Sequence, residues 1–407
     1  MFSFASLLTT LLVAVSIAAS PVEIRDSPVT LPMARKLNLQ GGTVNLLQHD
    51  QARATALKDR ATSGLDRRTG SAPITNEAVS YIAQVGIGSP PTTYYLIVDT
   101  DSSNICIGTD TAYVKTSTSY DTGEPVEVDY SSGSIDGTEY TDTVTLGNGL
   151  TVTDQSICVA ATSTGFTGVD DILGLGPVDL TEGTLTKEED TTISTFTDNL
   201  YTQGVISEIV VSISFEPTTS EEVTNGELTF GGTDATKYTG TIAYTPLTTT
   251  EPASYYWGIN ESITYGSTTI LSETAGIVGT GTTLILLASN AYSAYQSATG
   301  ATLDDTTGLL RITLTQYDAL ENLNFNVGSN TYALTPNGQI WPRALNTYIG
   351  GTSSYIYLVV NDLGTPSGEG LDFINGQMFL ERFYAVFDTT NSRVGFATTS
   401  YTDATTN

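Results

Sequence analysis

Histidine is almost absent from this chain of 407 residues, which has a single one, at position 49. Mechanisms in which His activates a Ser or Cys nucleophile therefore have no base in the rest of the chain. The acids, the two cysteines and this histidine do not have the spacing of metal ligands, and Gly231-Gly232 lacks the Lys and helix of a phosphate-binding loop. The sequence thus predicts no metal and no cofactor.

Basic residues are also scarce, with 15 Lys and Arg against 44 Asp and Glu and a net charge of −29. An acidic body repels phosphate backbones, which excludes nucleic acid as a partner. It comes close to neutrality only in acid, as suits an extracellular protein that is stable at low pH. Eight of the 15 basic residues lie between positions 21 and 70, where they face only five acids.

Long apolar runs are missing after the first 20 residues, so we expect no membrane span and no membrane partner. Residues 1–20 are apolar and end in small residues, which is the pattern of a secretory signal although its positive start is missing. A membrane anchor is less favoured, because Ser and Thr interrupt the run and no stop-transfer pattern follows. The sequence therefore predicts a secreted, extracellular protein.

The basic stretch after the signal is predicted to be a propeptide, residues 21–68, that docks on the acidic body and is later removed. Its dibasic end, Arg67-Arg68, lies among Gly, Ser and Thr, and we expect cleavage after Arg68. A solvated basic tail is the alternative interpretation.

The remaining chain has the composition of a β protein, with much Thr, Ser, Tyr and Gly and alternating runs such as 141–146. One eight-residue motif occurs twice, 180 residues apart: Ile-Val-Asp-Thr-Asp-Ser-Ser-Asn at 97–104 and Ile-Val-Gly-Thr-Gly-Thr-Thr-Leu at 277–284. Each copy reads as a strand that enters a tight loop, and each is followed by a residue pair ending in Gly, at 173–174 and 375–376. We predict two related lobes, 69–245 and 246–407, around a cleft suited to an extended peptide.

Several motifs occur in an order that resembles the pepsin family of aspartic peptidases, in its secreted fungal, polyporopepsin-like branch. They are Gly-Ile-Gly-Ser-Pro at 86–90, Asp-Thr-x-Ser-Ser-Asn at 99–104, a flap-like 128–134, Asp-Ile-Leu-Gly-Leu-Gly at 171–176, the second loop at 277–287, Phe-Ile-Asn-Gly at 373–376 and a closing hairpin at 387–397. The resemblance covers residues 80 to 400. It implies an all-β, bilobed fold, a monomer with a peptide or protein in its cleft, and a substrate-binding flap at Tyr130, Gly133 and Ser134.

In that family two aspartates, one from each lobe, share a proton, so that one stays neutral while the other activates water. Asp99 matches the first, but Gly279 stands at the second position and has no side chain. Losing one member of such a pair costs on the order of 10² to 10⁴ in rate. We therefore expect impaired or lost proteolysis, and a pKa for Asp99 close to that of an ordinary carboxyl.

Other residues around the two motifs agree with the family pattern at some positions and depart from it at others. The resemblance implies that Thr100 and Thr280 lock the loops together across the lobes, with Ser102 and Thr282 as the following hydroxyls. Asp101 replaces the usual Gly and brings a new charge beside the site.

Two functions remain open. The first is a pseudo-peptidase that binds peptides without cutting them. The second is an active acid endopeptidase that uses Asp99 with an unusual second carboxylate such as Asp101, although a pair on one loop would not straddle a peptide carbonyl as two lobes do.

Three further sites follow from the sequence. The two cysteines, Cys106 and Cys158, stand where the family usually has Trp and Gly, and we favour a disulfide over two buried thiols. Asn260 begins a glycosylation sequon that we place in a polar turn. Asp388-Thr389-Thr390, in the closing hairpin, is interpreted as a solvated turn acid rather than a site.

Overall fold

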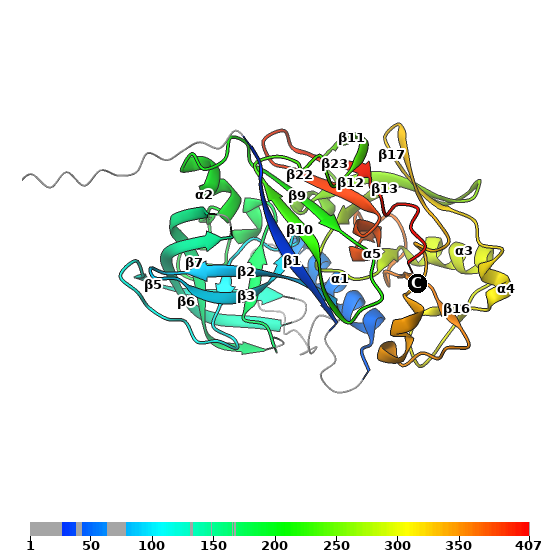
Figure 1. Cartoon of the computed structure of the whole chain (residues 1–407), viewed down its shortest axis with the longest axis horizontal. Coiled ribbons are helices and arrows are strands. Elements are labelled where there is room, and N and C mark those ends of the chain that lie inside the picture. The colour runs from blue at the N-terminus through cyan, green and yellow to red at the C-terminus, as the bar shows by residue number, and fades with distance from the viewer. Residues whose placement is uncertain are drawn as a thin grey trace, which may run out of the picture.

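The computed structural model describes residues 27–37, 43–62, 79–130, 133–147, 149–164, 166 and 168–406. The chain is mostly β, with the first half of the sequence on one side and the second half on the other (Figure 1). The predicted all-β, bilobed fold is thereby confirmed. The predicted signal at 1–20 and the dibasic pair Arg67-Arg68 lie outside the described residues.

One large sheet runs through both halves and contains, among the described residues, 13 strands. Its members are β1 (Val29–Leu37), β2 (Val79–Ile87), β3 (Thr92–Asp99), β4 (Cys106–Ile107), β5 (Tyr120–Tyr130), β6 (Gly133–Leu146), β7 (Leu150–Thr164), β8 (Asp171–Gly174), β9 (Val210–Phe215), β10 (Glu222–Phe230), β11 (Thr239–Pro246), β22 (Phe383–Asp388) and β23 (Arg393–Thr398). Strands β22 and β23, from the end of the chain, pair with β9 and β11. The boundary placed at residue 245 thus falls inside β11, and the division into lobes stays a prediction.

The second half builds two smaller sheets. Seven strands form one of them: β12 (Gly258–Tyr265), β13 (Thr268–Val278), β14 (Ile285–Leu287), β17 (Leu323–Val327), β18 (Asn330–Leu334), β20 (Val360–Asp362) and β21 (Phe373–Asn375). Three short strands form the other: β15 (Thr302–Leu303), β16 (Leu310–Ile312) and β19 (Ile356–Tyr357). Buried Val, Leu, Ile and Phe side chains from both halves make one large core, and two smaller apolar clusters lie apart from it.

Helices are few and short. They are α1 (Leu46–Thr62), α2 (Phe196–Thr202), α3 (Ser289–Thr299), α4 (Leu314–Tyr317) and α5 (Gln377–Leu380), with 3-10 turns η1 (Val178–Thr181), η2 (Ala253–Tyr255) and η3 (Arg343–Ile349). In the described part of the chain, no helix is long and apolar enough to cross a membrane.

The two repeated motifs are threaded in the same way. β3 lies parallel to β8, with Asp99 opposite Gly174, and β13 lies parallel to β21, with Val278 opposite Asn375. A Cβ at Gly174 would lie 2.6 Å from backbone atoms of Ser103, so only glycine allows the loop to pass. The pairing of each motif with its downstream partner, predicted from the sequence, is confirmed.

The basic N-terminal stretch is built into the fold. β1 lies between β10 and β2 in the large sheet and crosses the front of the molecule in Figure 1. Arg35 of β1 is buried, and its Nε lies 3.1 Å from Oε1 of the buried Glu381. Removing one partner of a buried ion pair leaves the other charge buried without compensation, which is strongly destabilising. This contact therefore holds β1 against the second half of the chain.

Asp171, at the start of β8, has a φ of 141°, which L residues rarely adopt, and its side chain is fully buried. Burial raises the pKa of this carboxyl well above its ordinary value, and the neighbouring Cys106 adds to the effect. We expect Asp171→Gly to stabilise the protein at pH 7 by roughly 1–2 kcal/mol, because it relieves backbone strain and removes a buried carboxyl. Urea denaturation measures the change.

The matched control is Asp170→Ala. The Asp170 carboxylate accepts hydrogen bonds from the backbone N–H of Tyr95 at 2.7 Å and of Thr111 at 2.8 Å. This variant should lose stability. Destabilisation by Asp171→Gly would contradict the assigned strain.

Candidate active site

The two motif loops meet through a reciprocal pair of hydrogen bonds. The backbone N–H of Thr100 donates to Oγ1 of Thr280, and the N–H of Thr280 donates to Oγ1 of Thr100, both at 3.0 Å. Both threonines are buried, so each bond satisfies a donor that water cannot reach. The contact holds the loops face to face although they are 180 residues apart.

Asp99 ends β3 and is fully buried. Its Oδ2 accepts a hydrogen bond from the Ser102 hydroxyl at 2.7 Å, and its Oδ1 accepts from the Asp101 N–H at 2.9 Å and from Arg53 Nη2 at 2.6 Å. Burial raises the pKa of Asp99, but the charge of Arg53 and these hydrogen bonds outweigh it, so the pKa lies below its ordinary value. The expectation of an ordinary pKa is therefore wrong.

Asp101 is buried close to Asp99. Its Oδ2 is 3.1 Å from the same Arg53 Nη2, and a Cβ built on Gly279 would lie 2.3 Å from its Oδ1 and 2.4 Å from its Oδ2. The carboxylate from the first loop thus fills the space in which a side chain at position 279 would begin. Burial, reinforced by the charge of Asp99 and opposed by Arg53, raises the pKa of Asp101 to about 7.

The second motif loop, around Gly279, has no carboxylate to match Asp99. The Thr282 hydroxyl is buried and has no hydrogen-bond partner among the described residues, whereas Ser102, its counterpart, holds Asp99. The backbone N–H of Gly279 donates to the carbonyl of Asn375 at 3.2 Å. The loop is therefore held in place by its backbone, without a carboxylate of its own.

Below this loop lies a buried carboxyl that the sequence interpretation missed. Asn375 Nδ2 donates to Oε2 of Glu261 on β12 at 3.0 Å, and both side chains are fully buried. Burial raises the pKa of Glu261 to about 8, so it stays protonated at neutral pH. The polar side chain of Asn375, in the threading strand β21, thus has a buried polar partner.

Helix α1 lies near the middle of the molecule (Figure 1) and contacts both motif loops. Arg53 reaches the first loop, and Asp50 Oδ2 accepts a hydrogen bond from the Leu284 N–H of the second at 2.7 Å. Tyr256 donates its hydroxyl proton to the Leu57 carbonyl at 2.9 Å. The basic stretch therefore contacts the acids at the centre of the site. The charge pattern predicted docking, but it did not single out Arg53.

Comparison with known proteins gives this arrangement a context. Residues 80–399 match the family described as eukaryotic aspartyl protease. The chain belongs to this family, that of pepsin.

Its relatives within the pepsin family include one that the chain covers almost completely. The chain is 62% identical over 339 residues to polyporopepsin from Irpex lacteus, covering 83% of this chain and 99% of the relative. Gastricsin from Suncus murinus is 29% identical over 347 residues, covering 80% and 83%. The crystal structure of aspartic proteinase from Irpex lacteus has a TM-score of 0.81 and 55% identity, covering 94% of this chain and all of that one. The polyporopepsin-like branch inferred from the motifs is confirmed.

The pepsin-family flap corresponds to the hairpin of β5 and β6, in which Asp129 pairs with Ser134 and Tyr130 with Gly133. Gly133 is buried, and the Ser134 N–H donates to Oγ1 of Thr164 at 3.1 Å. The Tyr130 side chain and residues 131–132 lie outside the described part. The hairpin is as predicted, and its role in substrate binding stays a prediction.

The cysteines differ from the expectation. Cys106 and Cys158 are buried and opposite each other on the parallel strands β4 and β7, but no disulfide joins them in the structure. Both thiols pack in an apolar cluster with Val126, Val128 and Ile172, as buried cysteines that act as small apolar side chains do. Burial raises the pKa of the Cys158 thiol, which disfavours the reactive thiolate.

Two other local interpretations need correction. Asn260 is exposed, but it lies in strand β12 rather than in a turn, and its Oδ1 accepts a hydrogen bond from the Thr248 hydroxyl at 2.9 Å. Asp388 is not solvated. It is buried and forms an ion pair with Arg393 at 2.7 Å. Asn260 thus lies in a strand, whereas Asp388 is the buried end of β22 and residues 389–390 form the turn that follows.

We expect Thr280→Val to destabilise the protein by about 1–3 kcal/mol, because it leaves the buried N–H of Thr100 without an acceptor. Chemical denaturation measures the loss. Thr282→Val is the matched control, since it removes a buried hydroxyl that has no partner among the described residues, and it should leave stability unchanged or higher. Equal effects of the two substitutions would argue against the threonine contact.

Proposed function

We propose that this protein is a secreted aspartic endopeptidase homologue with impaired proteolysis, in which Asp101 supplies the second carboxylate beside Asp99. One observation carries the proposal: the Asp101 carboxylate occupies the space in front of Gly279 and shares Arg53 Nη2 with Asp99, at 3.1 and 2.6 Å. A pair of acids is therefore present at the centre of the site, although both come from one loop.

The two carboxyls of the pair have different pKa values. The pKa of Asp99 lies below its ordinary value, while that of Asp101 is raised to about 7. Both pKa directions hold with Arg53 in place. After residues 21–68 leave, the Ser102 hydroxyl and the Asp101 N–H still favour the ionised form of Asp99, so Asp99 could activate water while the neutral Asp101 could protonate a peptide carbonyl. Two titratable groups whose pKa values are pushed apart are the usual basis of acid and base assignments.

The geometry also explains why proteolysis should be impaired. Two acids on a single loop approach a substrate from one lobe, whereas general acid and base must lie within hydrogen-bond reach of different reacting atoms. On the opposite loop, the buried Thr282 hydroxyl has no partner among the described residues. These same observations favour a second function, complete loss of cleavage with retained peptide binding. The cleft already accommodates a polypeptide in the form of α1.

The N-terminal stretch fits the role of a propeptide. β1 and α1 are packed into the protein, and Arg53 neutralises both acids, so residues 21–68 would block the site until they leave. An impaired enzyme cannot efficiently mature itself, and we propose that another enzyme cuts after Arg68. With the signal at 1–20 removed, the product would be an extracellular monomer, and the exposed Asn260 would be open to glycosylation.

Digestion of a denatured protein substrate at acid pH by the purified mature chain tests the proposal. We expect slow cleavage that is lost in both Asp99→Asn and Asp101→Asn, because each removes one member of the pair. Unchanged cleavage by Asp101→Asn would exclude its role. If the parent chain does not cleave at all but binds peptides in a fluorescence assay, the second function holds instead.

A further inference from the structure

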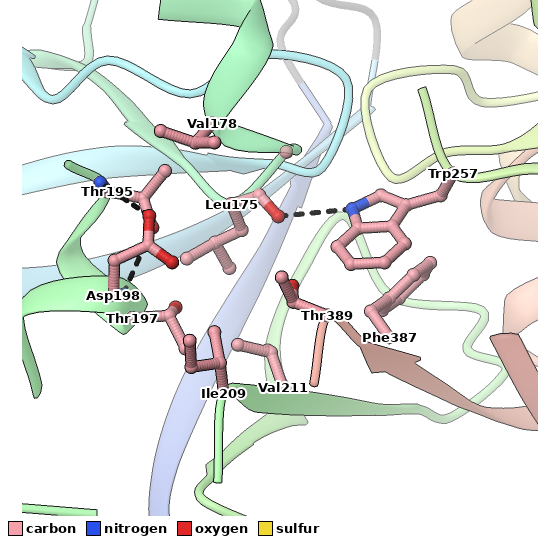
Figure 2. A pocket seen from close by; sticks show the side chains of 11 residues that line it. Leu175, Val178, Thr195, Thr197, Asp198, Ile209, Val211, Trp257, Phe387 and Thr389 are labelled. Atoms are coloured by element: carbon pink, nitrogen blue, oxygen red, sulfur yellow. Dashed lines mark hydrogen bonds between the residues drawn. The ribbon is translucent and has the colours of Figure 1, made fainter. Parts of the chain in front are cut away.

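Trp257 lies where the two halves of the chain meet behind the motif loops. Figure 2 shows its indole beside Leu175, which follows β8, and beside Phe387 of β22. Only 3% of Trp257 is exposed, and its ring centroid is 5.2 Å from that of Phe387. We infer that Trp257 is a positioning residue that couples the loop of Asp99 to the loop of Gly279.

A chain of backbone and side-chain hydrogen bonds carries this inference. The Leu175 N–H donates to the carbonyl of Asp99 at 2.7 Å, and Trp257 Nε1 donates to the carbonyl of Leu175 at 3.2 Å (Figure 2). The carbonyl of Trp257 in turn accepts from the N–H of Val278 at 3.1 Å, and Val278 directly precedes Gly279. One residue thus contacts the support of both loops, with its side chain on one side and its backbone on the other.

This connection is separate from the threonine contact. Thr100 and Thr280 join the loops one residue beyond Asp99 and Gly279, whereas Trp257 joins the strands that support these two positions. The threonine contact fixes the loops to each other at one position in each loop, and Trp257 adds a contact between the segments that support them. Because misplacement by about 1 Å can cost 10²-fold in rate, a second contact matters at this site.

The indole of Trp257 packs against Phe387 and borders a small cavity. The cavity is lined by Leu175, Gly176, Val178, Thr195, Thr197, Asp198, Ile209, Val211, Trp257, Phe387 and Thr389 (Figure 2). Within this packing, the bond from the indole N–H to the Leu175 carbonyl gives the ring a defined orientation.

The chain offers a matched control for this bond. Trp341 is fully buried, and its Nε1 has no hydrogen-bond partner in the described part of the protein. Trp257→Phe and Trp341→Phe remove the same atoms from a buried site, but only the first removes a hydrogen bond. A difference between the two variants therefore measures the effect of the lost hydrogen bond and not that of the lost ring volume.

Hydrogen–deuterium exchange of the full-length chain is the first test, and it needs no activity. Amides of residues 98–101 and 277–280 should exchange about tenfold faster in Trp257→Phe than in Trp341→Phe, because loss of one buried hydrogen bond has about this effect on a local equilibrium. Faster exchange at both loops supports the coupling. Equal exchange in the two variants overturns it.

The kinetic arm rests on the proposed function. In a chain that cleaves, Trp257→Phe should lower kcat about tenfold with little change in KM, since misplaced loops affect the reacting geometry more than substrate binding. Trp341→Phe should retain the parent kcat. A fall in KM alone, or equal kcat values, would overturn the positioning role. If no chain cleaves, the proposed function fails and the exchange measurement still decides the inference.

Discussion

A chain that carries both Gly279→Asp and Asp101→Gly should digest protein at acid pH about 10² to 10⁴ times faster than the parent chain, the range that a positioned acid or base contributes. The substitution at 279 places a carboxylate on the loop facing Asp99, where it can straddle the substrate carbonyl. It also brings an acceptor close to the buried Thr282 hydroxyl, which has no partner among the described residues. Initial rates on a denatured protein, with and without pepstatin, measure the gain.

The two substitutions should depend on each other. In Gly279→Asp alone, the new Cβ would lie 2.3 Å from Oδ1 of Asp101, so that one of the two side chains must move. We expect the single variant to be less stable than the double variant and less active. Adding Asp99→Asn to the double variant should abolish cleavage. A parent chain as fast as the double variant would show that the single-loop pair is fully competent.

Glu261→Gln should stabilise the protein at pH 8 by several kcal/mol and change little at pH 4. The pKa of Glu261 is about 8 in the folded protein, against an ordinary value of 4.5. Below pH 4.5 the carboxyl is neutral in both folded and unfolded chains, and it costs nothing through ionisation. Between pH 4.5 and 8 the unfolded chain loses the proton while the folded chain keeps it, so stability falls by about 1.4 kcal/mol for each pH unit.

Integrated over this window, the cost is on the order of 5 kcal/mol, and it levels off above pH 8. Urea denaturation of parent and variant at pH 4, 6 and 8 measures the difference. Glu273→Gln is the control, because that side chain is exposed on β13, and it should show no such trend. A difference between Glu261→Gln and the parent that stays constant with pH would contradict the raised pKa.

Sequence reasoning succeeded where the information was local or repeated. Short apolar runs and turn residues predicted the two motifs, their threading partners and the β5–β6 hairpin. The observed pairings of Asp99 with Gly174 and of Val278 with Asn375 agree with this prediction.

Sequence reasoning was wrong about the surroundings of two polar residues. Asn260 lies in strand β12 rather than in a turn, because tertiary pairing overrides the local preference of polar residues. Asp388 precedes the turn at Thr389 and Thr390, but it is buried and not solvated.

The sequence alone determined the architecture and the difference between the two motif loops, of which only the first has an aspartate at the catalytic position. Asp99 and Gly279 follow from a repeat 180 residues apart, and the basic N-terminal stretch predicted docking on an acidic body. Only the tertiary structure decided where the carboxylate of Asp101 goes. Its position in front of Gly279 depends on two loops brought together by Thr100 and Thr280 and on Arg53 from α1. The burial of these groups, which sets their pKa values, arises only when both halves of the chain close around them.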